Sequence, residues 1–482
     1  MCATSKKKEL RVLCINPWIY DFTAFDLWSK PLGLLYIAGL LKKAGVQVDF
    51  IDCLDKWHPE LLRRQGRVHP KLQKYGTGHF HRDVIQKPAC FDFVPRYYAR
   101  YGLPEDIFIK DLHRLNRPDA ILVTSIMTYW YSGPQRVVEI CRSLFPGVPI
   151  VLGGIYATLM PDHARKNIQP DYLIEGPGEH KITALLASLF NRADLLDDFP
   201  SDIDAFPPPA FELLHHNDYY VTMTSRGCPF RCTFCATYKV DSQFTQRKPE
   251  QVFHEIIAQT TRLNVRDVVF YDDALLMQSS RHIKPLLKML ASSESNLRFH
   301  APNGLHGRYI DEELADLMFR CHFRTIRISL ESVAKERLRD IHNKITPGEM
   351  TTAVQNLVSA GYKAEELETY IIMGLPGQNL EEVIETILYA HNLGVNVRLA
   401  SFSPIPGTEE YNRAVACGYF PQHADPLLTN KTIIPLYRTQ DAYERFQVVR
   451  NFTKLLNDKV KQGKRIRQVR KFRTEFMSAI AI

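Results

Sequence analysis

The sequence predicts an α/β protein built from two parallel sheets, and three observations support this prediction. In the first part of the chain, short apolar β-branched runs alternate with helical stretches, as buried parallel strands and their crossover helices do. The run Phe206-Pro-Pro-Pro-Ala210 interrupts the alternation, because proline fits neither a helix interior nor an inner strand. From residue 221 the alternation starts again as six strand–helix units. We therefore expect a Rossmann-like doubly wound sheet, a linker, and a second parallel sheet or barrel.

The composition is that of a large globular protein. The chain has 482 residues, of which 45% are hydrophobic and 24% charged, which predicts two to four domains. No apolar run approaches the roughly 20 residues that a membrane span needs, and the charged N-terminus is followed by no apolar segment of a signal peptide. Ten cysteines, seven of them scattered singly, fit a reducing compartment. We expect a cytoplasmic protein without a membrane span.

The net charge of +8 originates near the C-terminus. Eight Lys or Arg and no acidic residue lie between Lys459 and Arg473, and without them 53 basic residues face 53 acidic ones. Such a tail can contact nucleic acid or anionic lipid. Apolar residues nevertheless recur in this segment at helical spacing, namely Ile466, Val469, Phe472, Phe476 and Ile480. This spacing favours an amphipathic helix docked on the protein with its basic face in water, and we expect no nucleic-acid partner.

The first domain is predicted over residues 1–190. Its strands are residues 10–15, 46–51, 120–124, 149–152 and 172–174. In such sheets ligands lie beyond the carboxyl ends of the strands, and small or polar residues there let a bulky cofactor approach the backbone. The candidate cofactor-binding residues at these ends are Asn16, Ser125, Thr128, Gly153, Gly154, Glu175 and Gly176.

A long insertion, about residues 54–117, separates the second and third of these strands. It is rich in His and Tyr, and insertions of this length in a compact domain are usually functional. Because a β-to-α connection emerges on the ligand side of the sheet, we expect the insertion to cap the cofactor or to line the substrate cavity. The alternative, metal binding by its histidines, depends on the weak motif His79-x-His81.

The second domain is predicted over residues 211–419, after a linker at 191–210 and before a helical extension at 420–482. Its strands are residues 221–224, 268–271, 297–300, 325–330, 368–373 and 396–402. Active sites of barrels gather at the C-terminal strand ends, and the strands here end in acids, glycines and prolines. The candidate residues at these ends are Asp272, Asp273, Glu331, Ser332, Gly374, Pro376 and Gly377. For the two aspartates the alternative is a pair of solvated loop acids.

The first strand of the second domain runs into a loop with three cysteines, Cys228, Cys232 and Cys235. Thiolates ligate iron–sulfur clusters, and three of them leave one iron of a four-iron cluster open for chemistry. The alternative is a structural zinc site completed by His215 or His216, although such sites usually pair two C-x2-C motifs.

The cysteine spacing, the aromatic Phe234 and the entry Gly227-Cys-Pro resemble the radical S-adenosylmethionine (SAM) superfamily. The resemblance implies that the three cysteines hold a catalytic [4Fe–4S] cluster, that SAM chelates its open iron, and that one electron cleaves SAM to a 5′-deoxyadenosyl radical. It also implies a partial (β/α)6 TIM-type barrel, in which the loops after the second, fourth and fifth strands contact SAM. Gly-Leu-Pro-Gly-Gln at 374–378 is the best supporting motif after the cysteines.

The first domain resembles the cobalamin-binding domains found upstream of many radical SAM domains, where a serine loop and a Gly-Gly pair accommodate the nucleotide tail. It departs from other cobalamin proteins in one respect. No Asp-x-His-x-x-Gly motif follows the first strand, and Asp111-Leu-His113 lies in a predicted helix instead. The alternative is a degenerate Rossmann-like domain that binds no corrin.

Together these features identify the chain as similar to the cobalamin-dependent radical SAM enzymes. The resemblance implies [4Fe–4S], SAM and cobalamin as cofactors, and methylation of an unactivated carbon as the leading activity. A radical cyclase or rearrangement enzyme of the same architecture is the first alternative, and a non-catalytic redox or sensor protein is the second. A tRNA-modifying methylthiotransferase is disfavoured because the first domain has no second cysteine triad. The expected partners are a small-molecule or peptide substrate and an electron donor of flavodoxin or ferredoxin type.

Overall fold

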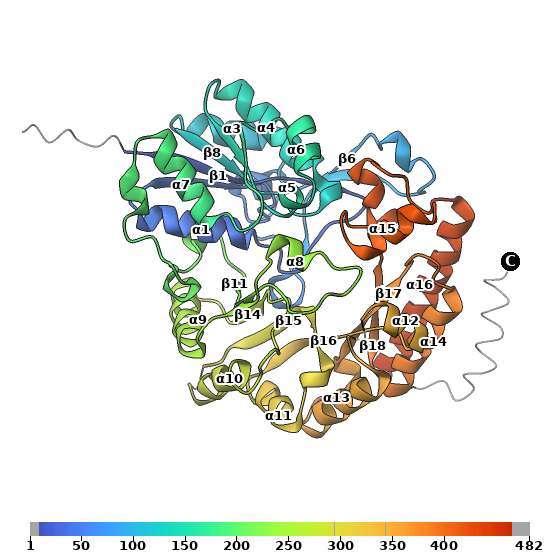
Figure 1. Cartoon of the computed structure of the whole chain (residues 1–482). Helices are drawn as coiled ribbons and strands as arrows, with labels where there is room; N and C mark the ends of the chain where they lie inside the picture. The colour runs from blue at the N-terminus through green and yellow to red at the C-terminus, as the bar shows by residue number, and fades with distance from the viewer. Residues whose placement is uncertain (1–8, 294, 343, 465–482) are drawn as a thin grey trace, which may run out of the picture. The chain divides into compact units, whose positions relative to one another are not determined.

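The structure is a computed structural model, and it describes residues 9–293, 295–342 and 344–464 (Figure 1). The chain divides into two compact units. Unit 1 comprises Met1–Lys87 and Arg96–Tyr219, and unit 2 comprises Pro88–Pro95 and Tyr220–Ile482. Eight residues of the long insertion therefore belong to the second unit. The prolines of the predicted linker lie within unit 1 against a helix, where the Ala210 amide donates to the Leu35 carbonyl (3.0 Å).

Unit 1 contains the predicted Rossmann-like sheet. Its five strands are parallel and lie in the order β10-β9-β8-β1-β4. They are β1 (Arg11–Asn16), β4 (Gln47–Asp52), β8 (Ala120–Val123), β9 (Ile150–Leu152) and β10 (Tyr172–Leu173). Each lies within a residue or two of the prediction, because buried parallel strands read as continuous apolar runs.

Helices cover both faces of this sheet, because successive side chains of a strand point to opposite faces. Leu13 and Ile15 of β1 pack in one apolar cluster with residues of α3 and α4, whereas Val12 and Cys14 pack in another with residues of α1 and α7. The helices of unit 1 are α1 (Leu32–Lys43), α2 (Pro59–Arg64), α3 (Glu105–Arg114), α4 (Ser132–Leu144), α5 (Ile155–Leu159), α6 (Pro161–Asn167) and α7 (Glu179–Leu189).

The insertion and the segment after β1 form two small antiparallel sheets that the sequence analysis did not predict. One has the order β2-β7-β6, and the other pairs β3 with β5. Their strands are β2 (Ile19–Asp21), β3 (Phe25–Asp26), β5 (Gly78–His79), β6 (Arg82–Ile85) and β7 (Tyr98–Tyr101). Strands of two to four residues carry too little periodicity to be recognised, and their partners lie far away in sequence.

Unit 2 is built on the six predicted strand–helix repeats. Its six-stranded parallel sheet follows chain order, β11-β14-β15-β16-β17-β18, so β11 and β18 are its edges and the barrel is partial. The strands are β11 (Tyr220–Thr222), β14 (Asp267–Phe270), β15 (Arg298–Leu305), β16 (Phe323–Glu331), β17 (Glu368–Met373) and β18 (Asn396–Ser401). Two further strands, β12 (Ser225–Arg226) and β13 (Thr245–Gln246), form an antiparallel pair beside it.

Helices form an arc around the outer face of this sheet (Figure 1). The arc contains α9 (Pro249–Leu263), α10 (Ile283–Ser292), α11 (Glu312–Arg320), α13 (Pro347–Ser359) and α14 (Leu380–Leu393). The unit also contains α8 (Thr237–Val240), α12 (Lys335–Asp340), α15 (Glu409–Ala416) and α16 (Gln440–Lys461). Local signals fix several ends: Thr346 and Glu349 form a capping box before α13, and Gly394 ends α14 in the left-handed conformation.

The two faces of the six-stranded sheet differ in chemistry. Phe270, Phe299 and Phe323 stack on one face with ring centroids 5.6–6.0 Å apart. On the other face the strands carry buried ionic pairs, including Asp267 with His300 (2.9 Å) and Arg327 with Glu368 (2.6 Å). The strand alternation therefore sends apolar side chains toward the helices and polar ones into the barrel.

The last described helix, α16, packs on β18. The Asn457 side chain accepts a hydrogen bond from the Val397 amide and donates one to its carbonyl (both 2.8 Å), so it satisfies backbone groups of this edge strand. The predicted amphipathic helix at 466–480 lies outside the described residues. Among residues 9–464, with the two single-residue gaps, no helix combines the length and apolarity that a membrane crossing requires.

Candidate active site

The three cysteines lie on a loop that leaves the carboxyl end of β11. Pairing of Ser225 with Gln246 and of Arg226 with Thr245 closes the neck of this loop. Gly227 follows with φ +71°, and a Cβ at this position would lie 2.3 Å from the Gln243 carbonyl oxygen. Only glycine fits this corner without strain, which explains the Gly-Cys entry to the loop.

The thiols of Cys228, Cys232 and Cys235 line one cavity of about 320 Å³. The Cys235 amide donates to the Cys232 carbonyl (3.0 Å), which folds the second half of the loop into a turn. Burial raises the pKa of Cys232 to about 12 and also raises the pKa of Cys228. These thiols are therefore protonated until a metal displaces the protons, as ligand thiols are. Three converging thiols of one loop fit the three protein ligands of a four-iron cluster.

Charged side chains from neighbouring strand ends face the same cavity. Asp273 follows β14, Glu331 ends β16, and Lys344 lies 3.7 Å from the Glu331 carboxylate. Burial in the concavity, together with the charge of Asp272, raises the pKa of Asp273 to about 6. Burial also raises the pKa of Glu331, against the favourable charge of Lys344. The cavity thus offers two carboxylates and an ammonium group beside the thiols.

The backbone at Glu331 is held in an unusual conformation. Its φ is +65°, and a register shift between β16 and β17 occurs at this residue. A non-glycine residue in this region costs free energy, and such strain concentrates at functional sites. The bulge turns the Glu331 side chain into the cavity.

Most of the other predicted residues of unit 2 take part in hydrogen bonds or turns within the protein. Asp272 accepts hydrogen bonds from Thr224 and Ser225. Ser332 is fully buried and donates to Glu382 (2.9 Å). The amides of Gly374 and Leu375 donate to the Gln378 side chain, which closes the turn that contains Pro376 and Gly377. Phe234 lines the cavity with the cysteines.

Among the cavity residues that the sequence analysis missed are Lys344 and His306, both of them titratable. His306 is buried and its ring stacks on Phe230 of the cysteine loop (centroids 4.5 Å apart). Burial, with the charges of Lys344 and Arg308, lowers the pKa of His306 to about 3, so the imidazole is neutral. Neither residue stands directly after a predicted strand, so the strand-end rule could not find them.

In unit 1 the predicted residues of β8 and β9 come together at neighbouring strand ends. The Ser125 hydroxyl donates to the Gly153 carbonyl (2.7 Å) and accepts from the Ala157 amide (3.3 Å). A Cβ at Gly154, whose φ is +98°, would lie 2.2 Å from the Ser125 carbonyl oxygen. At Gly153 a Cβ would meet nothing closer than Ile174, at 3.9 Å. Gly154 therefore serves the protein's own packing, whereas a Cβ at Gly153 would make only ordinary van der Waals contacts with Ile174.

The remaining predicted residues of unit 1 have mixed surroundings. Gly176 begins the loop after β10 and donates from its amide to the Thr158 hydroxyl (2.8 Å), whereas Glu175 forms an exposed ion pair with Arg165 (2.7 Å). Thr128 is buried at the start of a short helix after Ser125. Asn16 is buried and donates to Asp52 of the adjacent strand (2.7 Å).

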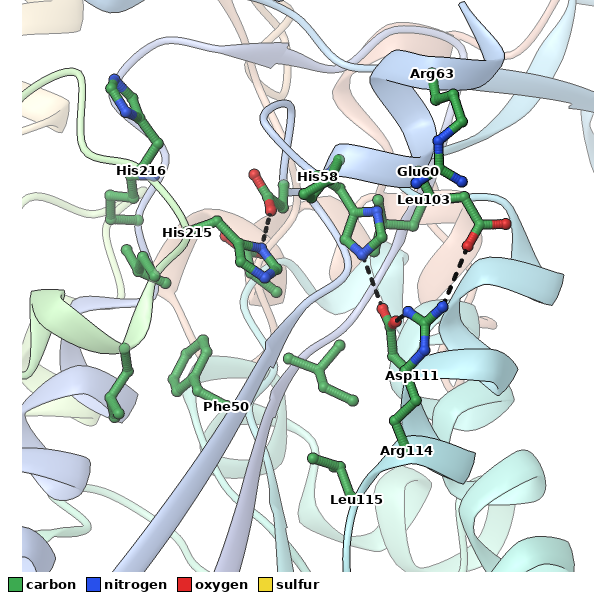
Figure 2. Close-up of a pocket in the computed structure, with 17 residues that line it drawn as sticks. Phe50, His58, Glu60, Arg63, Leu103, Asp111, Arg114, Leu115, His215 and His216 are labelled. Carbon is green, nitrogen blue, oxygen red and sulfur yellow. Dashed lines mark hydrogen bonds and ion pairs between the residues drawn. The ribbon is translucent and has the colours of Figure 1, made fainter.

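A second cavity, of about 320 Å³, lies in unit 1 at the end of the edge strand β4 (Figure 2). Residues of the insertion line it together with residues 213–216, which the sequence analysis placed at the start of the second domain and which the structure places in unit 1. The His58 ring points to the Asp111 carboxylate (3.0 Å), which also forms an ion pair with Arg114 (2.9 Å). His215 is paired with Asp55 (2.6 Å). Most of its charged groups are thus paired with one another.

These contacts involve histidines that the alternative zinc site would need as metal ligands. His215 and His216 are both engaged within unit 1, the latter stacked on Trp57 with ring centroids 3.8 Å apart. Within the described parts of the chain, no three His, Cys, Asp or Glu side chains gather around a single metal ion; the three cysteines of a cluster differ in that each ligates a separate iron. Asp111 and His113 lie in α3, as predicted.

Comparison with known proteins gives two family matches. The model of the radical SAM superfamily matches residues 222–390, and that of the B12-binding domain matches residues 101–186. A methyltransferase of Pyrococcus horikoshii described as uncharacterized is 25% identical over 65% of this chain and 74% of its own. The cytidylyl-2-hydroxyethylphosphonate methyltransferase of Streptomyces wedmorensis is 22% identical over 86% of this chain and 83% of its own.

A solved structure shows the same fold. The radical SAM methyltransferase TsrM of Kitasatospora setae, solved with cobalamin and a [4Fe–4S] cluster, superposes with a TM-score of 0.62 over 86% of this chain and 76% of that chain, at 15% identity. The open six-stranded barrel with three thiols in its cavity is that of a radical SAM enzyme. With the B12-binding domain that precedes it, the chain has the two domains of the cobalamin-dependent radical SAM enzymes.

Proposed function

We propose that this enzyme methylates an unactivated carbon of its substrate, using SAM both as the source of a radical and as the source of the methyl group. The observation that carries the proposal is the cavity of unit 2, where three cysteine thiols face Asp273, Glu331 and Lys344, in a chain that also carries a B12-binding domain. When bound, the cluster supplies the electron that cleaves SAM, and cobalamin supplies the means of methyl transfer.

The residues of the cavity have distinct proposed roles. Cys228, Cys232 and Cys235 hold the cluster. Glu331 and Asp273 accept hydrogen bonds from the cationic or hydroxyl groups of SAM, and Lys344 pairs with its carboxylate. Charge-assisted hydrogen bonds of this kind are about twice as strong as neutral ones.

In unit 1 the proposed cofactor contacts are the backbone around Ser125 and Gly153. The lack of a side chain at Gly153, where a Cβ would clash with nothing, supports this assignment, because a planar cofactor and its tail need close approach to the backbone. Because the loop directly after β1 contains no histidine, we expect bound cobalamin to show the absorption spectrum of the base-off form without histidine coordination.

The substrate and the electron donor are identified only by class. We expect a small molecule or a peptide that presents one carbon to the cavity, and a flavodoxin or ferredoxin that reduces the cluster. The B12 domain also fits the first alternative, a radical cyclase or rearrangement enzyme, so the test has to separate the two.

The test is a turnover experiment with SAM labelled in its methyl group. Methylation uses two molecules of SAM, so 5′-deoxyadenosine and S-adenosylhomocysteine should form in comparable amounts, with the label on a substrate carbon. Turnover that yields 5′-deoxyadenosine without S-adenosylhomocysteine, and an unlabelled product, would establish the cyclase or rearrangement instead. Candidate substrates come from the products of neighbouring genes.

A further inference from the structure

The two adjacent aspartates after β14 have opposite surroundings. Asp273 is exposed toward the cavity that contains the cysteine thiols. Asp272 is only 4% exposed and does not line that cavity. Sequence alone gives both residues the same role toward SAM, because both follow the same strand.

The Asp272 carboxylate is occupied by the two residues that precede the cysteine loop. It accepts hydrogen bonds from the Thr224 hydroxyl (2.7 Å) and the Ser225 hydroxyl (2.6 Å). The Thr224 amide lies 3.1 Å from both carboxylate oxygens. Three donors from two consecutive residues therefore converge on one side chain, and the geometry of a carboxylate fixes their directions.

The same two residues form one side of the neck of the loop. Ser225 begins β12, which pairs with β13 and closes the loop of the three cysteines. On the other side of Thr224, its carbonyl accepts hydrogen bonds from the His282 ring (3.1 Å) and the Arg247 amide (2.9 Å). Asp272, after β14, thus binds the side chains of Thr224 and Ser225, whereas His282, directly before α10, binds the Thr224 carbonyl.

A second buried group extends this support to β11. Arg247 donates to the Met223 carbonyl (3.2 Å) and to Glu255 (2.8 Å). Glu255 in turn accepts from the hydroxyls of Tyr220 and Thr222 (both 2.8 Å). The strand that delivers the cysteine loop is therefore fixed by buried polar contacts along its length. Of the residues held in this way, the two that Asp272 binds, Thr224 and Ser225, are the nearest to the cysteines in sequence.

We infer that Asp272 is a positioning residue for the iron–sulfur cluster, which it acts on through Thr224 and Ser225, and that Asp273 is the one member of the pair that faces SAM. The side chains around a cluster set its potential and spectrum through geometry, charge and hydrogen bonding. Removal of Asp272 changes the shape of the loop that carries all three ligands, whereas removal of Asp273 leaves that loop unchanged. The inference rests on the proposed cluster site.

The test compares Asp272→Asn with Asp273→Asn, two variants that remove the same charge from adjacent residues. Both hydroxyls donate to the same carboxylate oxygen, Oδ1. An asparagine whose amide oxygen takes that place turns its NH₂ group, a donor, toward the Thr224 amide, from which Oδ2 accepts in the wild type. After anaerobic reconstitution we expect Asp272→Asn to retain severalfold less iron and sulfide, and to change the electron paramagnetic resonance spectrum and the reduction potential of the cluster without SAM. We expect Asp273→Asn to match the wild type in these properties and to lose the spectral change that added SAM causes.

A milder variant keeps the test decisive if Asp272→Asn folds poorly. Ser225→Ala removes one donor to Asp272, and we expect a smaller spectral change in the same direction that adds little to the effect of Asp272→Asn, because coupled sites are not additive. A normal cluster spectrum and potential in Asp272→Asn or in Ser225→Ala, or a loss of the SAM response in Asp272→Asn with its cluster intact, would overturn the inference. Failure of the proposed function appears instead in the wild type, as protein that binds no cluster.

Discussion

The two parallel sheets of this chain prepare their carboxyl ends for ligands in different ways. In unit 2 the strand ends present charged and ligating side chains to a cavity, among them Cys232, Glu331 and Lys344. In unit 1 the corresponding ends of β8 and β9 present backbone, a hydroxyl and a bare Cα at Gly153. The difference matches the proposed ligands, because a cluster and SAM need specific charges whereas a large planar cofactor needs room.

The comparison also shows how differently two similar motifs use their residues. In the Gly-Gly pair, Gly154 packs on the protein itself and Gly153 is open, and in the Asp-Asp pair, Asp272 binds the protein and Asp273 faces the cavity. In each pair one residue, Gly154 or Asp272, contacts the protein itself. Its neighbour, Gly153 or Asp273, is available to the ligand. The largest expected effects therefore come from residues of the second kind and from the cysteines.

The largest effect is expected at the cysteines. Replacement of Cys228, Cys232 or Cys235 by Ala removes one of three protein ligands, so the variant should retain no [4Fe–4S] cluster and form no 5′-deoxyadenosine with dithionite and SAM. Iron and sulfide analysis and product detection measure both losses. The buried Cys321, replaced by Ala, serves as the control because it lies outside the cavity. Any triad variant that still forms 5′-deoxyadenosine contradicts the assignment.

The next effect is expected at Gly153. Leucine at this position adds a side chain at the proposed cofactor contact, and a steric cost of about 1–3 kcal/mol lowers cobalamin affinity about 5- to 150-fold. Gly33→Leu is the control in the same unit, because a Cβ at Gly33 would meet nothing within 4 Å. Titration with cobalamin measures both variants. Equal affinity in Gly153→Leu and the wild type would place the cofactor elsewhere or favour the degenerate-domain alternative.

The fold and the cysteine site were predictable because both depend on local signals. Continuous apolar runs predicted β1 and β8 within one residue at each end, and the spacing of the cysteines fixed the cluster loop. The direction of adjacent side chains was not predictable, because Asp272 and Asp273 differ only through Thr224 and Ser225, which are almost 50 residues away. Lys344 was missed for a similar reason, since its neighbour Glu331 reaches it through a bulge that the sequence does not indicate.

A smaller effect is expected from two further neighbours, Glu331 and Ser332. Glu331→Gln removes a charge from the cavity, and loss of a hydrogen bond to a charged group costs about 1.5–3 kcal/mol, so SAM should bind about tenfold more weakly or worse. Ser332→Ala removes a buried hydrogen bond to the Glu382 carboxylate and should lower stability by about 1.5–3 kcal/mol while SAM affinity stays unchanged. Calorimetry and thermal unfolding measure the two properties. Weaker SAM binding in Ser332→Ala would instead indicate that Ser332 contacts SAM.

The smallest effect concerns the His215–Asp55 pair of unit 1. Asp55 raises the pKa of His215, chiefly through their hydrogen bond, and the pKa of Asp55 is lowered in return despite its burial. A raised histidine pKa gives stability that is complete below the unfolded pKa of about 6.5 and is lost as the pH rises through the folded pKa. A lowered aspartate pKa gives stability that is lost only as the pH falls through that lower value. The pair therefore stabilises unit 1 at mildly acidic pH and not at alkaline pH.

The expected contribution of this pair to the stability of unit 1 is small, because the His215 side chain is 58% exposed and ion pairs in water contribute about 0.5 kcal/mol. All four tryptophans, Trp18, Trp28, Trp57 and Trp130, lie in unit 1, so tryptophan fluorescence follows the unfolding of this unit alone. His215→Gln should lower the urea midpoint at pH 6 and have no effect at pH 9. The exposed His113 on α3, changed to Gln, controls for loss of a histidine. A larger loss at pH 9 than at pH 6 would show that His215 acts through packing and not through its charge.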